Sequence, residues 1–157
     1  MKATTNSIPK TLRALSLLLI PRQAFSLSPI TMLTSSIKVP KQISIRSAGF
    51  NDVNGVYQQK HPTVIPSGFD RTCRSMNWDT AQMWNQLSDQ QRPWYEAENE
   101  SYIYWNKGDG KWWIDGPSGA GVYIVENAGW VPPTSGWISL DSDYQPVPTV
   151  LVEDGEL

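Results

Sequence analysis

Two aromatic runs separated by a short turn-forming segment are the feature that most restricts the fold of this chain. The first run is Ser101–Asn106 and the second is Lys111–Asp115, with Lys107–Gly110 between them. Aromatic and β-branched residues favour extended strands, and Gly and Asp favour tight turns. The pattern therefore predicts an antiparallel β-hairpin. At its end, Asp115 is expected to accept hydrogen bonds from amides of the following loop.

Further strands are predicted at short intervals on both sides of this hairpin, separated by turn-forming residues. They are Val56–Gln58, Val122–Glu126, Trp137–Leu140 and Pro146–Val152, with Gln42–Ser47 as either a first strand or the end of a leader. The prolines of the last segment place its beginning at a sheet edge. Because no strand–helix–strand repeat occurs, we expect a mainly β fold, a small antiparallel barrel or sandwich.

One segment, residues 79–88, breaks the β pattern and predicts a short inserted helix. Asp79 is a suitable N-cap, and Pro93 prevents the helix from continuing far beyond the segment. Its apolar side chains would share one face: Met83, Trp84 and Leu87. We therefore expect one helix between the early and the late strands.

Charge divides the chain into two parts with different expected roles. Residues 1–51 hold seven basic residues and no acidic one, whereas residues 52–157 hold all fifteen acidic residues and six basic ones. Binding to nucleic acid or to an anionic membrane surface requires a basic patch. The second part cannot form a large one, so we expect neither partner there.

The basic leader has the composition of two consecutive targeting segments. Residues 1–24 combine a basic start with a short apolar run and predict a signal peptide. Residues 25–46 are rich in hydroxyl groups, basic and free of acid, as in transit peptides. Phe25, directly after Ala24, resembles the junction of the bipartite plastid presequence of diatoms and related algae. That resemblance implies a plastid location, with a mitochondrion or secretion as alternatives, and the single Cys73 favours a reducing compartment.

The rest of the chain is long enough for one domain with a modest core, predicted as residues 47–152 with an insertion at 61–91 and a tail at 153–157. Four motifs occur in order: Asn54-Gly55-Val56-Tyr57, Tyr104-Trp105-Asn106, Lys111–Asp115 and Pro132-Pro133 followed by Gly136-Trp137. Together they resemble a small Trp-rich β-domain of algal, stramenopile and dinoflagellate proteins. The resemblance implies no established activity or catalytic residue. Because the 61–91 segment departs from that pattern, we expect any function peculiar to this chain there.

Candidate catalytic and metal-binding residues are few. Glu96, Glu98 and Glu100 alternate, so on a strand they would share one face, and paired carboxylates beside aromatic residues could serve in glycoside hydrolysis. A solvated strand face is the simpler interpretation, because three neighbouring like charges repel each other. His61 and Cys73 are the only residues of their types, too few for a zinc site. We therefore expect no enzyme activity, no cofactor and no metal.

The aromatic side chains remain as candidates for binding. All eight Trp lie between residues 78 and 137, and the alternation in the predicted hairpin places aromatic rings on both of its faces. One face would form the core and the other would bind a protein partner through Tyr102, Tyr104, Trp113 and Tyr123. Alternatively, the 79–88 helix covers that second face. A carbohydrate-binding module is the other expectation, with exposed Trp rings beside polar groups such as Asn106, Asp109 and Gln145.

Overall fold

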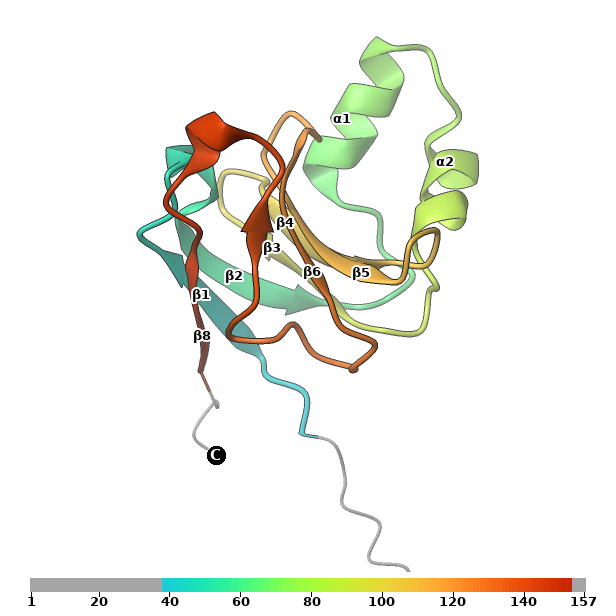
Figure 1. Ribbon diagram of the computed structural model, residues 1–157. Helices are drawn as coiled ribbons and strands as arrows, with labels where there is room; N and C mark the ends of the chain where they lie inside the picture. The colour runs from blue at the N-terminus through green and yellow to red at the C-terminus, as the bar shows by residue number, and fades with distance from the viewer. Residues whose placement is uncertain (1–37, 154–157) are drawn as a thin grey trace, which may run out of the picture. The chain divides into compact units, whose positions relative to one another are not determined.

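The computed structural model describes residues 38–153, which belong to one compact unit (Figure 1). The predicted signal peptide, residues 1–24, lies outside the described residues. So do residues 25–37 of the transit-like segment and residues 154–157 of the predicted tail. Within residues 38–153, no helix is long and apolar enough to cross a bilayer.

A single antiparallel sheet of eight strands forms most of the domain, in the order β7-β6-β5-β4-β3-β2-β1-β8. The strands are β1 (Gln42–Arg46), β2 (Gly55–Lys60), β3 (Trp94–Ala97), β4 (Tyr102–Asn106), β5 (Lys111–Asp115), β6 (Gly121–Glu126), β7 (Ile138–Ser139) and β8 (Thr149–Glu153). Short 3-10 turns lie at Asn51–Val53 and Ser142–Tyr144. The sheet curls into a half-barrel, which confirms the predicted fold class.

The predicted aromatic hairpin is confirmed as β4 and β5. Ile103 pairs with Ile114 and Trp105 with Trp112, so these four side chains share one face of the hairpin. Gly110 ends the connecting turn at a φ of 71°, in the left-handed region that favours glycine. The hairpin therefore presents two separate rows of large side chains, one on each face of the sheet.

The folded unit begins earlier than the predicted boundary at residue 47. Residues Gln42–Arg46 form β1, which lies between β2 and β8 in the sheet. Ile43 and Ile45 are fully buried, at 0% and 1% exposure. The end of the predicted transit-like segment is therefore part of the domain. Of the two interpretations of residues 42–47, a first strand is correct and the end of a leader is not. The predicted closing strand is also present, although it starts at Thr149, after its prolines, and lies at a sheet edge.

The inner face of the curled sheet holds the main hydrophobic core. Its buried side chains come from seven of the eight strands and from the connecting loops, among them Ile43, Tyr57, Tyr95, Ile103, Trp112, Tyr123, Trp137 and Val150. Two buried tyrosine hydroxyls donate to backbone oxygens, Tyr57 to Val53 at 2.6 Å and Tyr95 to Pro40 at 3.2 Å. These bonds satisfy polar groups whose burial would otherwise oppose folding.

Two helices, rather than the predicted one, lie between β2 and β3: α1 (Ser67–Ser75) and α2 (Thr80–Leu87). The second is the predicted helix, and the Asp79 carboxylate accepts a hydrogen bond from the Gln82 amide at 3.0 Å, as expected of an N-cap. The first was not predicted, because Gly68 and several hydroxyl residues give it a low helical propensity. Both helices cover part of the outer face of the sheet (Figure 1).

Candidate functional site

Trp84 of α2 is the centre of an aromatic cluster on the outer face of the sheet. Its ring centroid lies 5.2 Å from that of Phe69 on α1 and 5.2 Å from that of Tyr104 on β4. Trp94 and Tyr102 follow at 6.2 Å and 6.4 Å. All five side chains are buried, and burial of each contributes about 1.5–3 kcal/mol. The cluster therefore fixes the helices firmly over β3 and β4.

The predicted aromatic binding face is, for this reason, largely covered. Tyr102 and Tyr104 lie beneath the helices and are 0% and 4% exposed. The expectation that they form an exposed surface is wrong, and the alternative in which the 79–88 helix covers the second face is confirmed. Trp113 is half-buried at the border of the cluster and retains an exposed part.

Tyr123, the fourth predicted binding residue, lies on the opposite face of the sheet. It pairs with Ile114 and therefore shares the inner face with it. The Tyr123 hydroxyl donates to the carbonyl oxygen of Tyr144 at 2.6 Å and accepts a hydrogen bond from the Phe50 amide at 3.0 Å. Its role is thus to join the N- and C-terminal parts of the domain, and the structure does not bring it together with Trp113.

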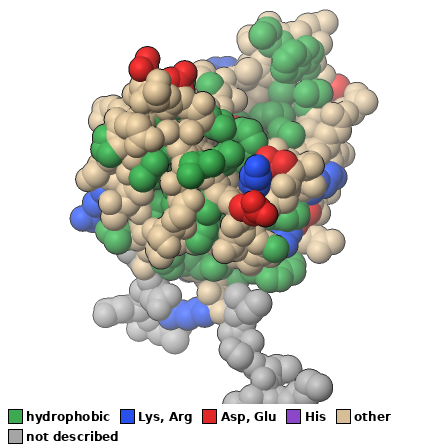
Figure 2. All heavy atoms as spheres, viewed as in Figure 1, with side chains coloured by type: hydrophobic (Ala, Val, Ile, Leu, Met, Phe, Trp, Pro, Cys, Tyr) green, Lys and Arg blue, Asp and Glu red, His purple; other side chains and the backbone are tan. Residues whose placement is uncertain are grey.

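Beyond the helices, the outer face over β5, β6 and β7 is uncovered and apolar. Trp113 pairs with Ile124 and Ile124 with Ile138, so the three side chains form a row across the strands. Leu140 follows two residues after Ile138 on the same face. We call these four residues the uncovered strip; Ile124 lies between the others and is itself only 8% exposed. Ile138 and Leu140 are 58% and 45% exposed, and hydrophobic side chains gather on this side of the molecule (Figure 2).

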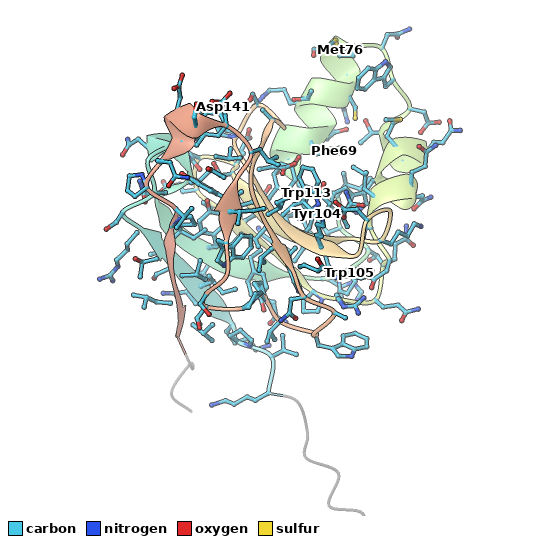
Figure 3. The ribbon with its side chains drawn as sticks, in the orientation of Figure 1. Phe69, Met76, Tyr104, Trp105, Trp113 and Asp141 are labelled. Carbon is cyan, nitrogen blue, oxygen red and sulfur yellow. The ribbon has the colours of Figure 1, made fainter. Side chains whose placement is uncertain are left out.

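The exposed edge of Trp113 is held in place by polar and steric contacts. Its indole Nε1 donates to the Asp109 carboxylate, with distances of 3.0 Å and 3.2 Å to the two oxygens. The ring lies over Gly121, where a Cβ would come within 2.6 Å of ring atom Cζ3 and 3.1 Å of Leu140 Cδ1. Glycine is therefore needed for the ring to lie against the sheet, between the helices and β7 (Figure 3).

The segment that carries the uncovered strip is acidic. Between residues 109 and 143 the sequence has five acidic residues and one basic residue, Lys111. Asp115 is buried, whereas Glu126, Asp141 and Asp143 are exposed. Lys111 pairs across the strands with Glu126. The apolar strip thus lies in a region of net negative charge.

Asp115 has the most strongly altered carboxyl group within residues 38–153. It is 4% exposed, and burial raises its pKa from the ordinary 3.8 to about 7. The adjacent Tyr102 hydroxyl offsets part of this shift, although neither that hydroxyl nor Asp115 Oδ1 has a hydrogen-bond partner of good geometry. The predicted contact with loop amides is absent, since the Gly119 amide donates to Gly116 instead. Sequence reasoning missed this site because the burial of Asp115 and Tyr102 depends on contacts between segments that are distant along the chain, and α1 was not predicted.

The three alternating glutamates do not share a strand face, so that expectation is wrong. β3 ends before Glu98, which is exposed in a turn. Glu96 accepts a hydrogen bond from the Ser67 amide at 2.7 Å, and Glu100 forms an ion pair with Arg71. Glu96 and Glu100 thus hold α1 against the sheet, and the turn that contains Glu98 lies between them. The arrangement does not provide an acid and a base across a sugar bond.

The candidate carbohydrate platforms are also engaged within the chain. The Arg92 guanidinium lies 3.8 Å from the ring centroid of Trp105 and 5.2 Å from that of Trp130. It also donates to the carbonyl oxygens of Ala128 and Gly129. Cation–π contacts of this kind stabilise by about 0.5–1 kcal/mol or more. Arg92 therefore occupies one face of each ring.

The polar groups expected beside a sugar platform have partners as well. Asn106 is buried and its side-chain oxygen accepts from the Gly108 amide at 2.8 Å. Asp109 accepts from Trp113, and the Gln145 amide donates to the Ser139 hydroxyl at 2.7 Å. Within the described part of the chain, no group of three or more His, Cys, Asp or Glu side chains could hold a metal ion.

Comparisons with models of known protein families, with curated proteins and with solved structures find no match to this chain. The resemblance to a Trp-rich β-domain and to a plastid presequence therefore stays a prediction. The fold itself defines the class: a curled antiparallel half-barrel with a two-helix insertion on its outer face.

Proposed function

We propose that this protein is a non-enzymatic docking domain that binds a protein partner through the uncovered strip. The observation that supports this is the row of Trp113, Ile124, Ile138 and Leu140 on a part of the outer face that the helices leave uncovered. Contiguous exposed apolar surface on a small domain usually marks an interaction site. A partly buried Trp beside aliphatic side chains is also typical of the residues that dominate binding energy.

The surrounding charge indicates the chemistry of the partner. Because exposed carboxylates at Glu126, Asp141 and Asp143 accompany the strip, a complementary partner presents apolar anchors flanked by Lys or Arg. Such complementarity mainly raises the association rate and the specificity. Binding should therefore weaken with added salt, while the apolar contacts retain part of the affinity.

A carbohydrate-binding module is the weaker candidate. Sugar stacking requires an open aromatic ring with free polar groups beside it. Here Arg92 lies against Trp105 and Trp130, and the Asp109 carboxylate is already bonded to the Trp113 indole. A contiguous apolar strip favours a protein partner over a sugar.

Docking would occur in a plastid. This location rests on the composition of residues 1–46 and on Phe25 at the predicted junction. The test is microscopy of the full chain with a C-terminal fluorescent tag, compared with a Phe25→Ala variant. Retention of the variant in the secretory route, with the unmodified chain in the plastid, would support the targeting signal.

The docking test compares two substitutions that introduce the same charge at similarly exposed positions. Ile138→Asp alters the uncovered strip, and Val64→Asp alters the loop before α1, where the side chain is 47% exposed. The C-terminally tagged full chain and both variants are purified gently from the source organism. We expect a partner protein to co-purify in stoichiometric amount with the unmodified chain and with the Val64→Asp variant. The amount of this partner should fall at least about tenfold with Ile138→Asp, because a buried unpaired charge is costly.

Trp113→Ala should release the same partner, because it removes the largest side chain of the strip. A chain that purifies alone, or that is eluted by free sugars, would count against docking and favour the carbohydrate alternative. Equal retention of the partner by the Ile138→Asp and Val64→Asp variants would mean that binding occurs elsewhere. The folded state of each variant is checked by circular dichroism before these results are compared.

A further inference from the structure

We propose that β8 pairs with β8 of a second copy of this chain, so that two sheets join into one continuous antiparallel sheet. This surface lies at the opposite end of the strand order from β7 and does not depend on the docking proposed above. Among residues 38–153, β1 is the only strand that pairs with β8. The other edge of β8 is therefore open to a further strand.

The directions of the backbone groups follow from the register. The Lys41 carbonyl accepts a hydrogen bond from the Gln59 amide at 2.9 Å, so it points toward β2. Since successive residues of a strand direct their backbone groups to alternate sides, Ser44 points toward β8, where it is paired with Leu151. Leu151 is therefore bonded to β1, and the N–H and C=O groups of Val150 and Val152 point toward the open edge.

This edge lacks the features with which proteins normally prevent pairing. Edge strands are usually protected by lysine, proline, a bulge or a covering element. The strand Thr149–Glu153 contains no lysine or proline, and its pairing with β1 shows no register shift. Leu151 and Val152 are 39% and 36% exposed. Between Thr149 and Glu153 the strand is thus apolar and regular, and within residues 38–153 no strand pairs with its outer edge.

Only one two-fold register forms all of its hydrogen bonds within β8. It places Leu151 opposite its own copy and Val150 opposite Val152, with about four new backbone hydrogen bonds. Thr149 then faces Glu153. A shift toward the N-terminus brings Pro148, which has no N–H, into the ladder. A shift toward the C-terminus pairs Val150 with residue 154, beyond the end of β8, and so loses hydrogen bonds within the strand.

The same register extends a row of residues on the outer face in which a valine and a leucine lie on either side of the buried Ser44. Val56, Ser44 and Leu151 lie side by side across β2, β1 and β8. Val56 is 47% exposed. In the dimer this row meets its copy at Leu151, so an exposed apolar side chain of the edge strand becomes covered. The surface that this strand pairing buries is small compared with the about 1,200–2,000 Å² buried in a stable interface. We therefore expect a weak, concentration-dependent dimer.

The first test is the mass of the full chain by sedimentation equilibrium between about 10 μM and about 1 mM. We expect a rise from 17.7 kDa toward twice that value. Leu151→Asp should keep the chain monomeric, because it places two like charges opposite each other. Val152→Pro should do the same, since it removes an outward N–H and leaves the bonds to β1 intact. Val56→Asp, on the same face but two strands away, is the matched control and should still dimerise.

The second test fixes the register with a disulfide. In the proposed pairing the two Leu151 Cα atoms lie about 4.5 Å apart, within the range that a disulfide can bridge. Leu151→Cys should therefore form a covalent dimer under mild oxidation. Thr149→Cys, whose copy lies about 13 Å away along the strand, should not. A mass of 17.7 kDa at the highest concentration, or equal cross-linking of the two variants, would overturn the proposal.

Discussion

Replacement of Asp115 by Asn tests whether the buried carboxyl destabilises the fold when it is ionised. Asp115 is buried on the outer face of the sheet beside the Tyr102 hydroxyl, and burial raises its pKa to about 7. A carboxyl whose pKa is raised on folding favours the folded state when protonated. Its contribution is therefore most favourable below about pH 4, falls as the pH rises from about 4 to 7, and is constant above pH 7.

The magnitude follows from the two pKa values. Each unit of pKa difference corresponds to 1.36 kcal/mol, and the pKa of Asp115 rises from 3.8 in the unfolded chain to about 7 in the fold. Relative to a permanently neutral side chain, the folded state is destabilised by about 4 kcal/mol at pH 8 and by about 2 kcal/mol at pH 5. The difference in unfolding free energy between Asp115→Asn and the unmodified protein should therefore change by roughly 2 to 3 kcal/mol over this range.

Urea unfolding followed by circular dichroism at pH 5, 6, 7 and 8 measures this difference. The test uses only the change of this free-energy difference with pH. Any effect of the new amide that does not depend on pH therefore cancels. Glu98→Gln is the matched control, because it also removes one negative charge, but from an exposed turn. A difference for Asp115→Asn that stays constant from pH 5 to 8 would refute the assignment of a raised pKa.

Substitutions at Trp84 and Asp79, with controls, test the attachment of the helices. Trp84→Ala should lower the unfolding free energy by about 3–5 kcal/mol, since Trp84 contacts four aromatic rings. Trp78→Ala, at a site 50% exposed, should cost less than about 1 kcal/mol in the same urea titration. Asp79→Ala should cost about 1 kcal/mol through loss of the N-cap of α2, and an Asp79→Asn variant that loses as much would contradict the capping role.

The parts of the fold that local sequence patterns determine were predicted well. The β4–β5 hairpin follows from two aromatic runs and one turn, and α2 follows from its cap and its apolar spacing. Both depend on interactions within about fifteen residues. The β8 strand was also recognised, with its prolines outside the ladder at the sheet edge.

The exposure of the aromatic residues could not be predicted, because it depends on contacts between distant segments. Alternation in β4 placed Tyr102 and Tyr104 on one face, which is correct. Whether that face is exposed to solvent depends on α1, which Phe69 holds against the aromatic cluster. The sequence of α1 gives only a weak local indication of a helix. Tyr123 was assigned to the wrong face because its register opposite β5 includes an irregularity between Ile114 and Asp115 that no local pattern reveals.

The size of the insertion explains why part of the outer face remains uncovered. At 1.5 Å per residue, helices of nine and eight residues are only about 12–14 Å long, whereas neighbouring strands lie about 4.8 Å apart. Two such helices cannot cover an eight-stranded sheet. Beyond them, exposed polar residues such as Gln58 and Thr149 suit solvent. The uncovered strip, and Val56 and Leu151 on either side of Ser44, are the apolar parts of this face, and these are the two places where we infer partners.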